Sequence, residues 1–277
     1  MPEAIRVEAR IEAVTPLGAG VREIRLRAAS AHDFLPGQYL EILHPDGAPI
    51  AFSIASAPNE LPHLTLHYLA QPDSEDATRM EALLVTGTTL QLLLPHGACG
   101  FTAPLKHPLL ALAGGSGVAQ VRSILRARLP APVPVRLYWG AATRDDLYLA
   151  AELDELAAQH AEFTWIAVAE ESDLEQSDLE QSNLEQSNLE QSNLEKAASF
   201  DPAAGTGATA TMRRGRVADA VAADIAAGEL ELEAWQVLVA GGPPMVWGTV
   251  KALRPLGLCA EQTLSDVFSY APRDDLW

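Results

Sequence analysis

Two glycine-rich turns are the parts of this sequence best suited to chemistry. The first, Gly114-Gly115-Ser116-Gly117, follows the apolar run 108–113, and the second, Gly241-Gly242-Pro243-Pro244-Met245, follows the apolar run 235–240. A glycine turn between a strand and a helix lets the backbone approach a pyrophosphate, and the N–H groups that open the helix favour its negative charge. The sequence therefore predicts a dinucleotide site at these two turns.

Metal and hydrolase chemistry find less support. His63 and His67 are four residues apart in an alternating segment, but no Glu follows His63, so the zinc-binding His-Glu-x-x-His pattern is absent. Ser116 fails the nucleophile-elbow pattern because position 118 is valine. Cys99 and Cys259 are too far apart for a Cys-x-x-Cys pair or an iron–sulfur ligand set. We predict no metal site and expect redox chemistry to come from an organic cofactor.

The elements around the first turn fall into two types. In segments 5–13, 24–28 and 64–68 apolar residues alternate, and turn residues such as Pro36-Gly37 separate the short runs. This pattern predicts antiparallel strands closed into a small barrel. From 103 onward, apolar strands alternate with helices expected at 118–129, 145–159, 217–226 and 244–254, which predicts a parallel, doubly wound Rossmann-like sheet.

The predicted fold class is therefore β plus α/β, with a barrel domain over 1–102 and an α/β domain over 103–277. Ligands of such a sheet bind at the carboxyl ends of its strands, where both glycine turns fall.

A tandem repeat interrupts the second domain. Segment 172–196 holds five units of the form Ser-(Asp/Asn)-Leu-Glu-(Gln/Lys), and a five-residue step scatters the leucines around a helix. The units resemble pentapeptide repeats of β-helices, but five units are too few to bury a core. We expect a solvated, flexible or locally helical loop, with a partner-binding element or a real β-coil as alternatives.

Composition excludes some partners. The chain has 277 residues, 48% of them hydrophobic, and 19 Lys+Arg against 37 Asp+Glu give a formal charge of -18. Phosphate backbones and anionic lipids would repel most of this surface. No apolar run approaches the roughly 20 residues of a membrane helix, and the N-terminus lacks a secretory pattern. We expect a cytoplasmic protein that binds neither nucleic acid nor membrane.

Six motifs in matching order carry a resemblance over nearly the whole chain outside the repeat. They are Phe52-Ser53-Ile54-Ala55-Ser56-Ala57-Pro58, Leu94-Pro95-His96-Gly97, Ala113-Gly114-Gly115-Ser116-Gly117, Leu137-Tyr138-Trp139-Gly140, Gly241-Gly242-Pro243-Pro244-Met245 and Ser265-Asp266-Val267-Phe268-Ser269-Tyr270-Ala271-Pro272. The chain resembles the ferredoxin–NADP reductase superfamily, and within it the small NAD(P)H:flavin oxidoreductases.

The resemblance implies a flavin in the barrel and NADH or NADPH on the α/β domain, with hydride passing between their rings. It makes Ser53 the catalytic residue, beside the nitrogen that accepts hydride, and Phe52 a packing partner of the flavin. The remaining residues it implies for flavin are Ile54, Ala55, His67, Pro95 and Gly97. For the nicotinamide cofactor they are Gly114, Gly115, Ser116, Gly117, Thr143, Arg144, Gly241, Gly242, Pro243, Met245, Phe268 and Tyr270, of which Phe268 and Tyr270 are expected to cover the ring pocket.

The chain departs from the family pattern at three positions. Ile50 stands where the family has an arginine that clamps flavin phosphate, a contact worth roughly 10- to 100-fold in affinity; Arg79 is a basic residue that could compensate. Ala240 replaces a common cysteine, so we expect activity without a thiol. Gln120 replaces a common proline and is treated as neutral.

The nicotinamide preference is less determined by the sequence. Arg144 could meet a 2′-phosphate, whereas Asp145 and Asp146 would repel one. We expect NADH to be favoured and both cofactors to be accepted.

The first hypothesis is a flavin reductase that binds FMN, FAD or riboflavin as a dissociable substrate and supplies reduced flavin to another enzyme. The second is a subunit that keeps FAD and passes electrons to a protein partner, such as an oxygenase. The third is a weakly catalytic scaffold that acts through the repeat.

Overall fold

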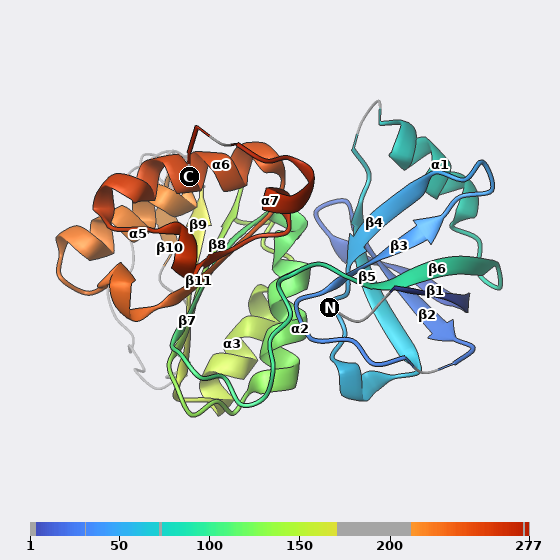
Figure 1. Ribbon diagram of the computed structural model, residues 1–277, viewed down its shortest axis with the longest axis horizontal. Helices are drawn as coiled ribbons and strands as arrows, with labels where there is room; N and C mark the ends of the chain where they lie inside the picture. Colours follow the sequence, from blue (N-terminus) through green and yellow to red (C-terminus); the bar gives the residue numbers. More distant parts are fainter. Residues whose placement is uncertain (1–3, 31, 72–73, 171–211, 274, 277) are drawn as a thin grey trace, which may run out of the picture.

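The computed structural model describes residues 4–30, 32–71, 74–170, 212–273 and 275–276. An all-β part and an α/β part lie side by side (Figure 1). The repeat over 172–196, and the three interpretations of it, lie outside the described residues.

The N-terminal part is the predicted antiparallel barrel. Its strands pair antiparallel in the order β4-β3-β6-β1-β2-β5, and a bridge between Ile54 and Leu66 joins the two edges. Alternating residues such as Ile11, Ile24 and Leu40 are fully buried inside it, which is why period-two alternation revealed these strands. The elements are β1 (Ile5–Gly18), β2 (Val21–Ala28), β3 (Tyr39–Leu43), β4 (Pro49–Ser53), β5 (His63–Leu69), helix α1 (Glu75–Leu83) and β6 (Thr89–His96).

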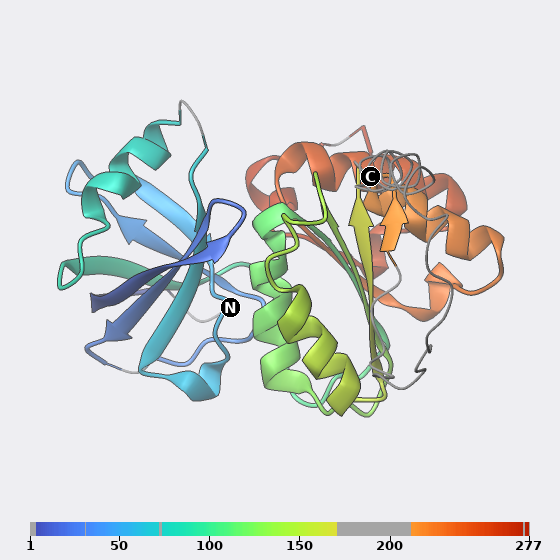
Figure 2. The ribbon, with the colours of Figure 1, turned by 180° about the vertical axis from the view of Figure 1, so that it is seen from behind.

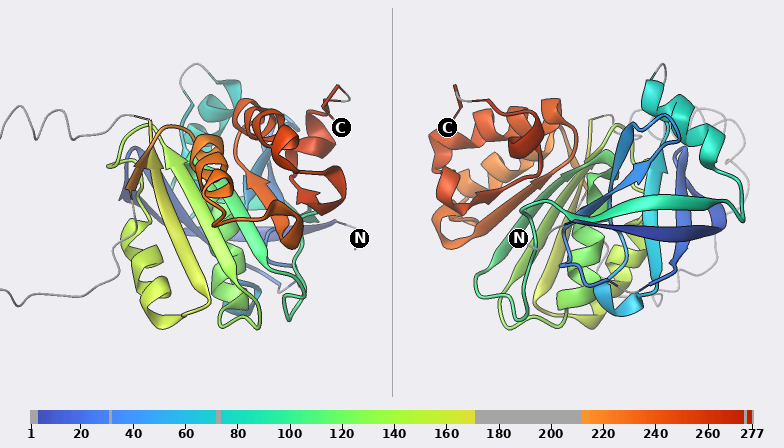
Figure 3. Two further views of the ribbon diagram at one scale, coloured as in Figure 1. Left: turned by 90° about the vertical axis from the view of Figure 1, so that its left-hand side faces the viewer. Right: turned by 45° about the vertical axis from the view of Figure 1, so that its right-hand side comes forward.

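The second part is the predicted parallel sheet, with strand order β10-β9-β8-β7-β11-β12. Helices cover both faces, α2 and α3 on one and α5 and α6 on the other (Figures 2 and 3). The elements are β7 (Leu109–Gly114), α2 (Val118–Arg128), β8 (Val135–Ala141), α3 (Ala150–Gln159), β9 (Phe163–Ala169), β10 (Met212–Arg214), α5 (Val217–Ala226), β11 (Gln236–Ala240), α6 (Pro243–Leu253), β12 (Thr263–Leu264) and α7 (Val267–Tyr270). Short 3₁₀ turns occur at Pro58–Glu60, Gly115–Gly117, Leu232–Ala234, Arg254–Leu256 and Ala260–Gln262.

One helix boundary differs from its prediction. The helix expected from Asp145 begins at Ala150, because the preceding residues form a turn closed by a hydrogen bond from the Leu147 N–H to the Arg144 carbonyl (3.1 Å). Asp146 also accepts bonds from the N–H and hydroxyl of Thr143 (both 2.9 Å).

The strand order reverses between β7 and β11, and the two glycine turns meet at this switch point. A Cβ on Gly117 would lie 2.4 Å from the Ala240 carbonyl oxygen, so the turns touch through bare backbone. Helix α2 then runs between the sheet and the barrel (Figure 1), where Ser123 donates to the Ser56 carbonyl (2.7 Å) and Arg122 to the Ala55 carbonyl (3.0 Å). The glycine turns therefore face the barrel.

Candidate functional site

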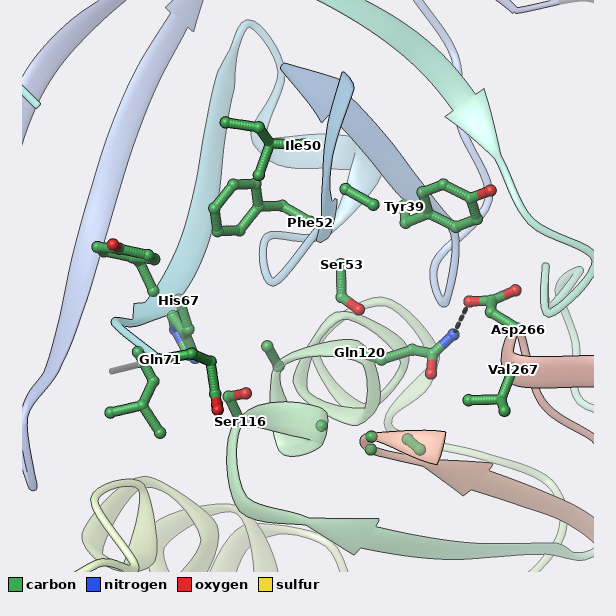
Figure 4. Close-up of a pocket in the computed structure, with 18 of the residues that line it drawn as sticks. Tyr39, Ile50, Phe52, Ser53, His67, Gln71, Ser116, Gln120, Asp266 and Val267 are labelled. Atoms are coloured by element: carbon green, nitrogen blue, oxygen red, sulfur yellow. Dashed lines mark hydrogen bonds between the residues drawn. The ribbon is translucent and has the colours of Figure 1, made fainter. Parts of the chain in front are cut away.

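A cavity of about 540 Å³ lies between the barrel and the α/β part. Strands β3, β4 and β5 and the start of α1 line it on one side, and both glycine turns and the segment 265–270 line it on the other (Figure 4). It lies at the switch point of the sheet, where open α/β sheets bind ligands.

Ser53 and Phe52 stand at the end of β4 and line this cavity. The Ser53 side chain lies over the cavity (Figure 4) and its hydroxyl forms no hydrogen bond with any described residue, which leaves it for a ligand. The Phe52 ring packs edge-on against Tyr68, with 6.0 Å between ring centroids. Together they offer an aromatic face and a hydroxyl donor beside it.

His67 of β5 is only 6% exposed and lines the same cavity. Its Nδ1 lies 3.1 Å from the Tyr148 hydroxyl, across the interface between the two parts. Its Nε2 is buried and has no partner among the described residues. Burial, followed by the charge of Arg122, lowers the pKa of His67 to about 3. The imidazole therefore stays neutral, and Nε2 can make one hydrogen bond to a ligand.

Asp266 and Gln120 form a polar bridge at the opposite wall. Gln120 Nε2 donates to Asp266 Oδ2 (2.7 Å) and to the Gly37 carbonyl of the barrel (2.6 Å). Burial raises the pKa of Asp266, while hydrogen bonds from Cys99 and Gln120 oppose that rise. These donors, together with the backbone N–H groups of Ala98 and Cys99, favour the charged carboxylate.

The charged residues of the cavity are all acidic. Glu41, Asp76 and Asp266 line it, and no lysine or arginine does so within the described part of the chain. Arg79 lies outside the lining and is already paired with Asp46 (2.9 Å), Asp76 (3.1 Å) and Glu75 (3.3 Å). The cavity thus offers no cation to a phosphate.

The glycine turns face two cavities. Ser116, Gly117, Gly241 and Gly242 line the first one. Gly114, Gly115 and Met245 line a second, of about 520 Å³, between α5 and α6. A dinucleotide that crosses the turns would have one end in each cavity, with its pyrophosphate over the start of α2.

The structure brings only some of the expected site residues to these cavities. Tyr270 lines the first one, but Phe268 packs on Trp247 (ring centroids 4.9 Å apart). Thr143 is held by Asp146, and neither Thr143 nor Arg144 lines either of these two cavities. Glu170, Arg216 and Asp219 line the second cavity instead.

Four more residues expected at the flavin lie behind the cavity surface. The side chains of Ile54 and Ala55 are fully buried, and Pro95 is buried in β6. Gly97 packs on the bridge, since a Cβ there would lie 2.6 Å from Asp266 Oδ1. Pro243 opens α6 beside the second turn.

The sequence interpretation missed the bridging role of Gln120 and the contact between His67 and Tyr148. One available signal was a polar residue at 120 among the apolar residues of the α2 face, since Gln120 is only 4% exposed. The partner of His67 had no local signal, because Tyr148 lies 81 residues further along the chain.

The residues present fit a flat heteroaromatic ligand. Phe52 gives it a face, and the Ser53 hydroxyl and the unpartnered Nε2 of His67 give it hydrogen bonds. These are the groups that a flavin ring system needs, whereas the charged side chains that its phosphate would meet in the described lining are all acidic.

The described residues contain no group of three or more His, Cys, Asp or Glu side chains placed to hold a metal ion. They also contain no helix with the length and apolar character to cross a membrane.

The chain is similar to known oxidoreductases. Residues 111–204 match the oxidoreductase NAD-binding domain family. An NAD(P)H-flavin reductase of Vibrio harveyi is 32% identical over 173 residues, covering 60% of this chain and 73% of that protein. The ferredoxin–NAD(P)(+) reductase component of the naphthalene 1,2-dioxygenase system of Pseudomonas putida is 24% identical over 90% of this chain and 64% of its own.

Among solved structures, a ferredoxin NADP+ reductase from Neisseria gonorrhoeae with bound FAD and NADP superposes with a TM-score of 0.64. It is 19% identical, and the match covers 95% of this chain and 98% of that one. The shared fold is thus a barrel followed by a parallel α/β sheet.

Proposed function

The chain belongs to the ferredoxin–NADP reductase superfamily, and on this basis we propose that it is an NAD(P)H:flavin oxidoreductase that uses flavin as a dissociable substrate. A bound flavin supplies the ring that accepts hydride from the nicotinamide. The observation that carries the proposal is the cavity lining, which offers neutral polar groups to a ring and whose charged side chains, among the described residues, are all carboxylates.

Each residue has a definite task in this proposal. Phe52 packs beside the flavin ring, the Ser53 hydroxyl donates a hydrogen bond near the nitrogen that accepts hydride, and neutral His67 bonds the ring edge through Nε2. The glycine turns hold the nicotinamide cofactor through backbone N–H groups. No acid or base is required, because catalysis rests on the alignment of two rings.

Weak binding of the flavin tail follows from three features. Ile50 cannot pair with phosphate, and Arg79 is already neutralised by three carboxylates. The N-terminus of α1, which could attract an anion, carries Glu75 and Asp76 in its first turn. Riboflavin should therefore bind at least as tightly as FMN or FAD.

The test is a visible spectrum of the dialysed protein, followed by NADH and NADPH oxidation with and without added riboflavin or FMN. A colourless protein that oxidises NADH only with added flavin supports the proposal. A yellow protein that reduces artificial acceptors without added flavin contradicts it. The NADH preference stays a prediction, which the ratio of kcat/KM for the two nicotinamide cofactors will decide.

An electron-transfer subunit is the second candidate. The observation that favours it is the similarity to the naphthalene dioxygenase reductase component, which extends over 90% of this chain, compared with 60% for the flavin reductase of Vibrio harveyi. It predicts retained FAD and reduction of a protein acceptor. Only the first candidate, the flavin reductase, implies a partner enzyme that receives reduced flavin.

A further inference from the structure

One buried amide joins three separate segments of the chain. Gln120 is the third residue of α2, and its two N–H donors are both used, one by the Gly37 carbonyl and one by Asp266. Gly37 belongs to the barrel, and Asp266 precedes α7 in the C-terminal segment. Figure 4 shows the bond between Gln120 and Asp266 at the wall of the cavity.

The barrel is packed tightly around this bridge. A Cβ on Gly97 would lie 2.6 Å from Asp266 Oδ1 and 2.9 Å from Tyr39, so the chain after β6 touches the carboxylate directly. Gln38 in turn donates to the Gly97 carbonyl (3.2 Å). A shift of Asp266 must therefore move the edge of the barrel that borders the cavity.

We propose that Gln120 is a positioning residue that sets the alignment of the barrel with the α/β part, and that its bond to the Asp266 carboxylate makes this alignment depend on the charge of Asp266. The inference rests on the proposed function, in which each part holds one of the two reacting rings. A hydrogen bond to an ionised carboxylate is about twice as strong as a neutral one. A misplacement of about 1 Å can slow a reaction between two held groups on the order of 100-fold.

Titratable groups from three neighbouring segments of the chain face Asp266. Cys99 follows β6, Tyr39 lies in β3 with His96 stacked on its ring, and Tyr270 ends α7. No described Lys, Arg or His forms an ion pair with Asp266. Gln120 is thus one of the few groups that favour the charged form, and its removal should raise the pKa of Asp266.

The test compares Gln120→Met, which keeps the size and removes both donors, with Ser123→Ala. Ser123 is a matched control because its hydroxyl also joins α2 to a barrel carbonyl, but it does not touch Asp266 or the cavity. The readouts are the Asp266 titration by carboxyl ¹³C NMR, amide hydrogen exchange of residues 95–101, and the single-turnover rate of hydride transfer from NADH to riboflavin.

For Gln120→Met we expect the Asp266 titration to move upward by about one pH unit and exchange at 95–101 to accelerate. Hydride transfer should slow by roughly 10- to 100-fold, with the KM for NADH within about threefold. Ser123→Ala should leave the titration and the hydride rate near wild type. An unchanged titration in Gln120→Met, or equal effects of the two variants, would overturn the proposal.

Gln120→Glu covers the case in which the methionine variant does not fold. A glutamate there can donate to Asp266 only when it is protonated, so its hydride rate should rise as the pH falls, opposite to wild type. A rate that falls with pH in both proteins rejects the proposal. If the wild type transfers no hydride to any flavin, the proposed function fails. The titration and exchange data then still test whether Gln120 holds Asp266 and the barrel edge in place.

Discussion

Substitution of Ile50 by arginine tests the central claim, that the cavity lacks a cation for phosphate. Ile50 precedes Phe52 by two residues in β4, so both side chains lie on the same face of the strand, and both line the cavity (Figure 4). An arginine at 50 would bring a guanidinium to the lining, where Glu41 and Asp76 are now the nearby charged residues of the barrel side.

The expected gain is specific to phosphate. A charge-assisted contact of arginine with phosphate is worth about 1.5–3 kcal/mol, on the order of 10- to 100-fold in Kd. In Ile50→Arg the Kd for FMN should fall by that factor, whereas the Kd for riboflavin should stay within about threefold. The gain should shrink at high salt, because part of it is Coulombic.

The assay is quenching of flavin fluorescence at low and high salt, with Ile50→Met as a control of similar volume. The control should leave the ratio of the FMN and riboflavin Kd values unchanged. Ile50 is 5% exposed, so a thermal unfolding curve must first show that the arginine variant is folded. If a folded Ile50→Arg variant binds FMN no better relative to riboflavin, the residue at position 50 does not limit phosphate binding.

Ser53→Ala removes the free hydroxyl from the cavity and should lower kcat/KM for riboflavin about tenfold with a smaller change in flavin Kd, measured by stopped-flow and fluorescence titration; an equal loss in both would mean that the hydroxyl only binds. Asp224→Ala leaves Tyr138 and Arg213 without their shared buried acceptor and should reduce the free energy of unfolding by about 3 kcal/mol, with Asp224→Asn losing less; urea titration checks the order. Folding lowers the pKa of His67 from 6.5 to about 3, so between these pH values the unfolded chain binds a proton that the folded chain does not bind. The contribution of neutral His67 to the free energy of unfolding is therefore fully present above pH 6.5 and is lost as the pH falls toward 3. About 2 kcal/mol should disappear between pH 7 and pH 5, and a His67→Gln variant with the same pH dependence of unfolding would contradict this.

The fold was predictable because its signals are local. The alternation in β1, β2 and β5 and the glycine turns after β7 and β11 can each be recognised from a few consecutive residues. The start of α3 was not predictable, since Asp145 and Asp146, which suit the first turn of a helix, lie instead in a turn at 143–147.

The character of the site was harder to foresee because it depends on distant pairs. Glu41 and Asp76 come from β3 and α1 of the barrel part and Asp266 from the C-terminal segment, and the packing of the two parts brings Asp266 to the same cavity as the other two. The same holds for Gln120, whose acceptors lie 83 and 146 residues away. Comparison with the family motif showed that isoleucine replaces the arginine at position 50, but it could not reveal that Arg79 is already paired with three carboxylates.

The proposed use of flavin as a dissociable substrate also has a kinetic consequence. An enzyme that treats flavin as a substrate must release the reduced product in every cycle, and product release limits many enzymes. A phosphate clamp would slow that release, because affinity differences between related complexes arise mostly in the dissociation rate. On this argument the isoleucine at 50 and the carboxylates at 41 and 76 favour turnover with free flavin over retention of a bound one. The arginine variant should therefore gain affinity for FMN and lose kcat with it, while kcat with riboflavin stays unchanged.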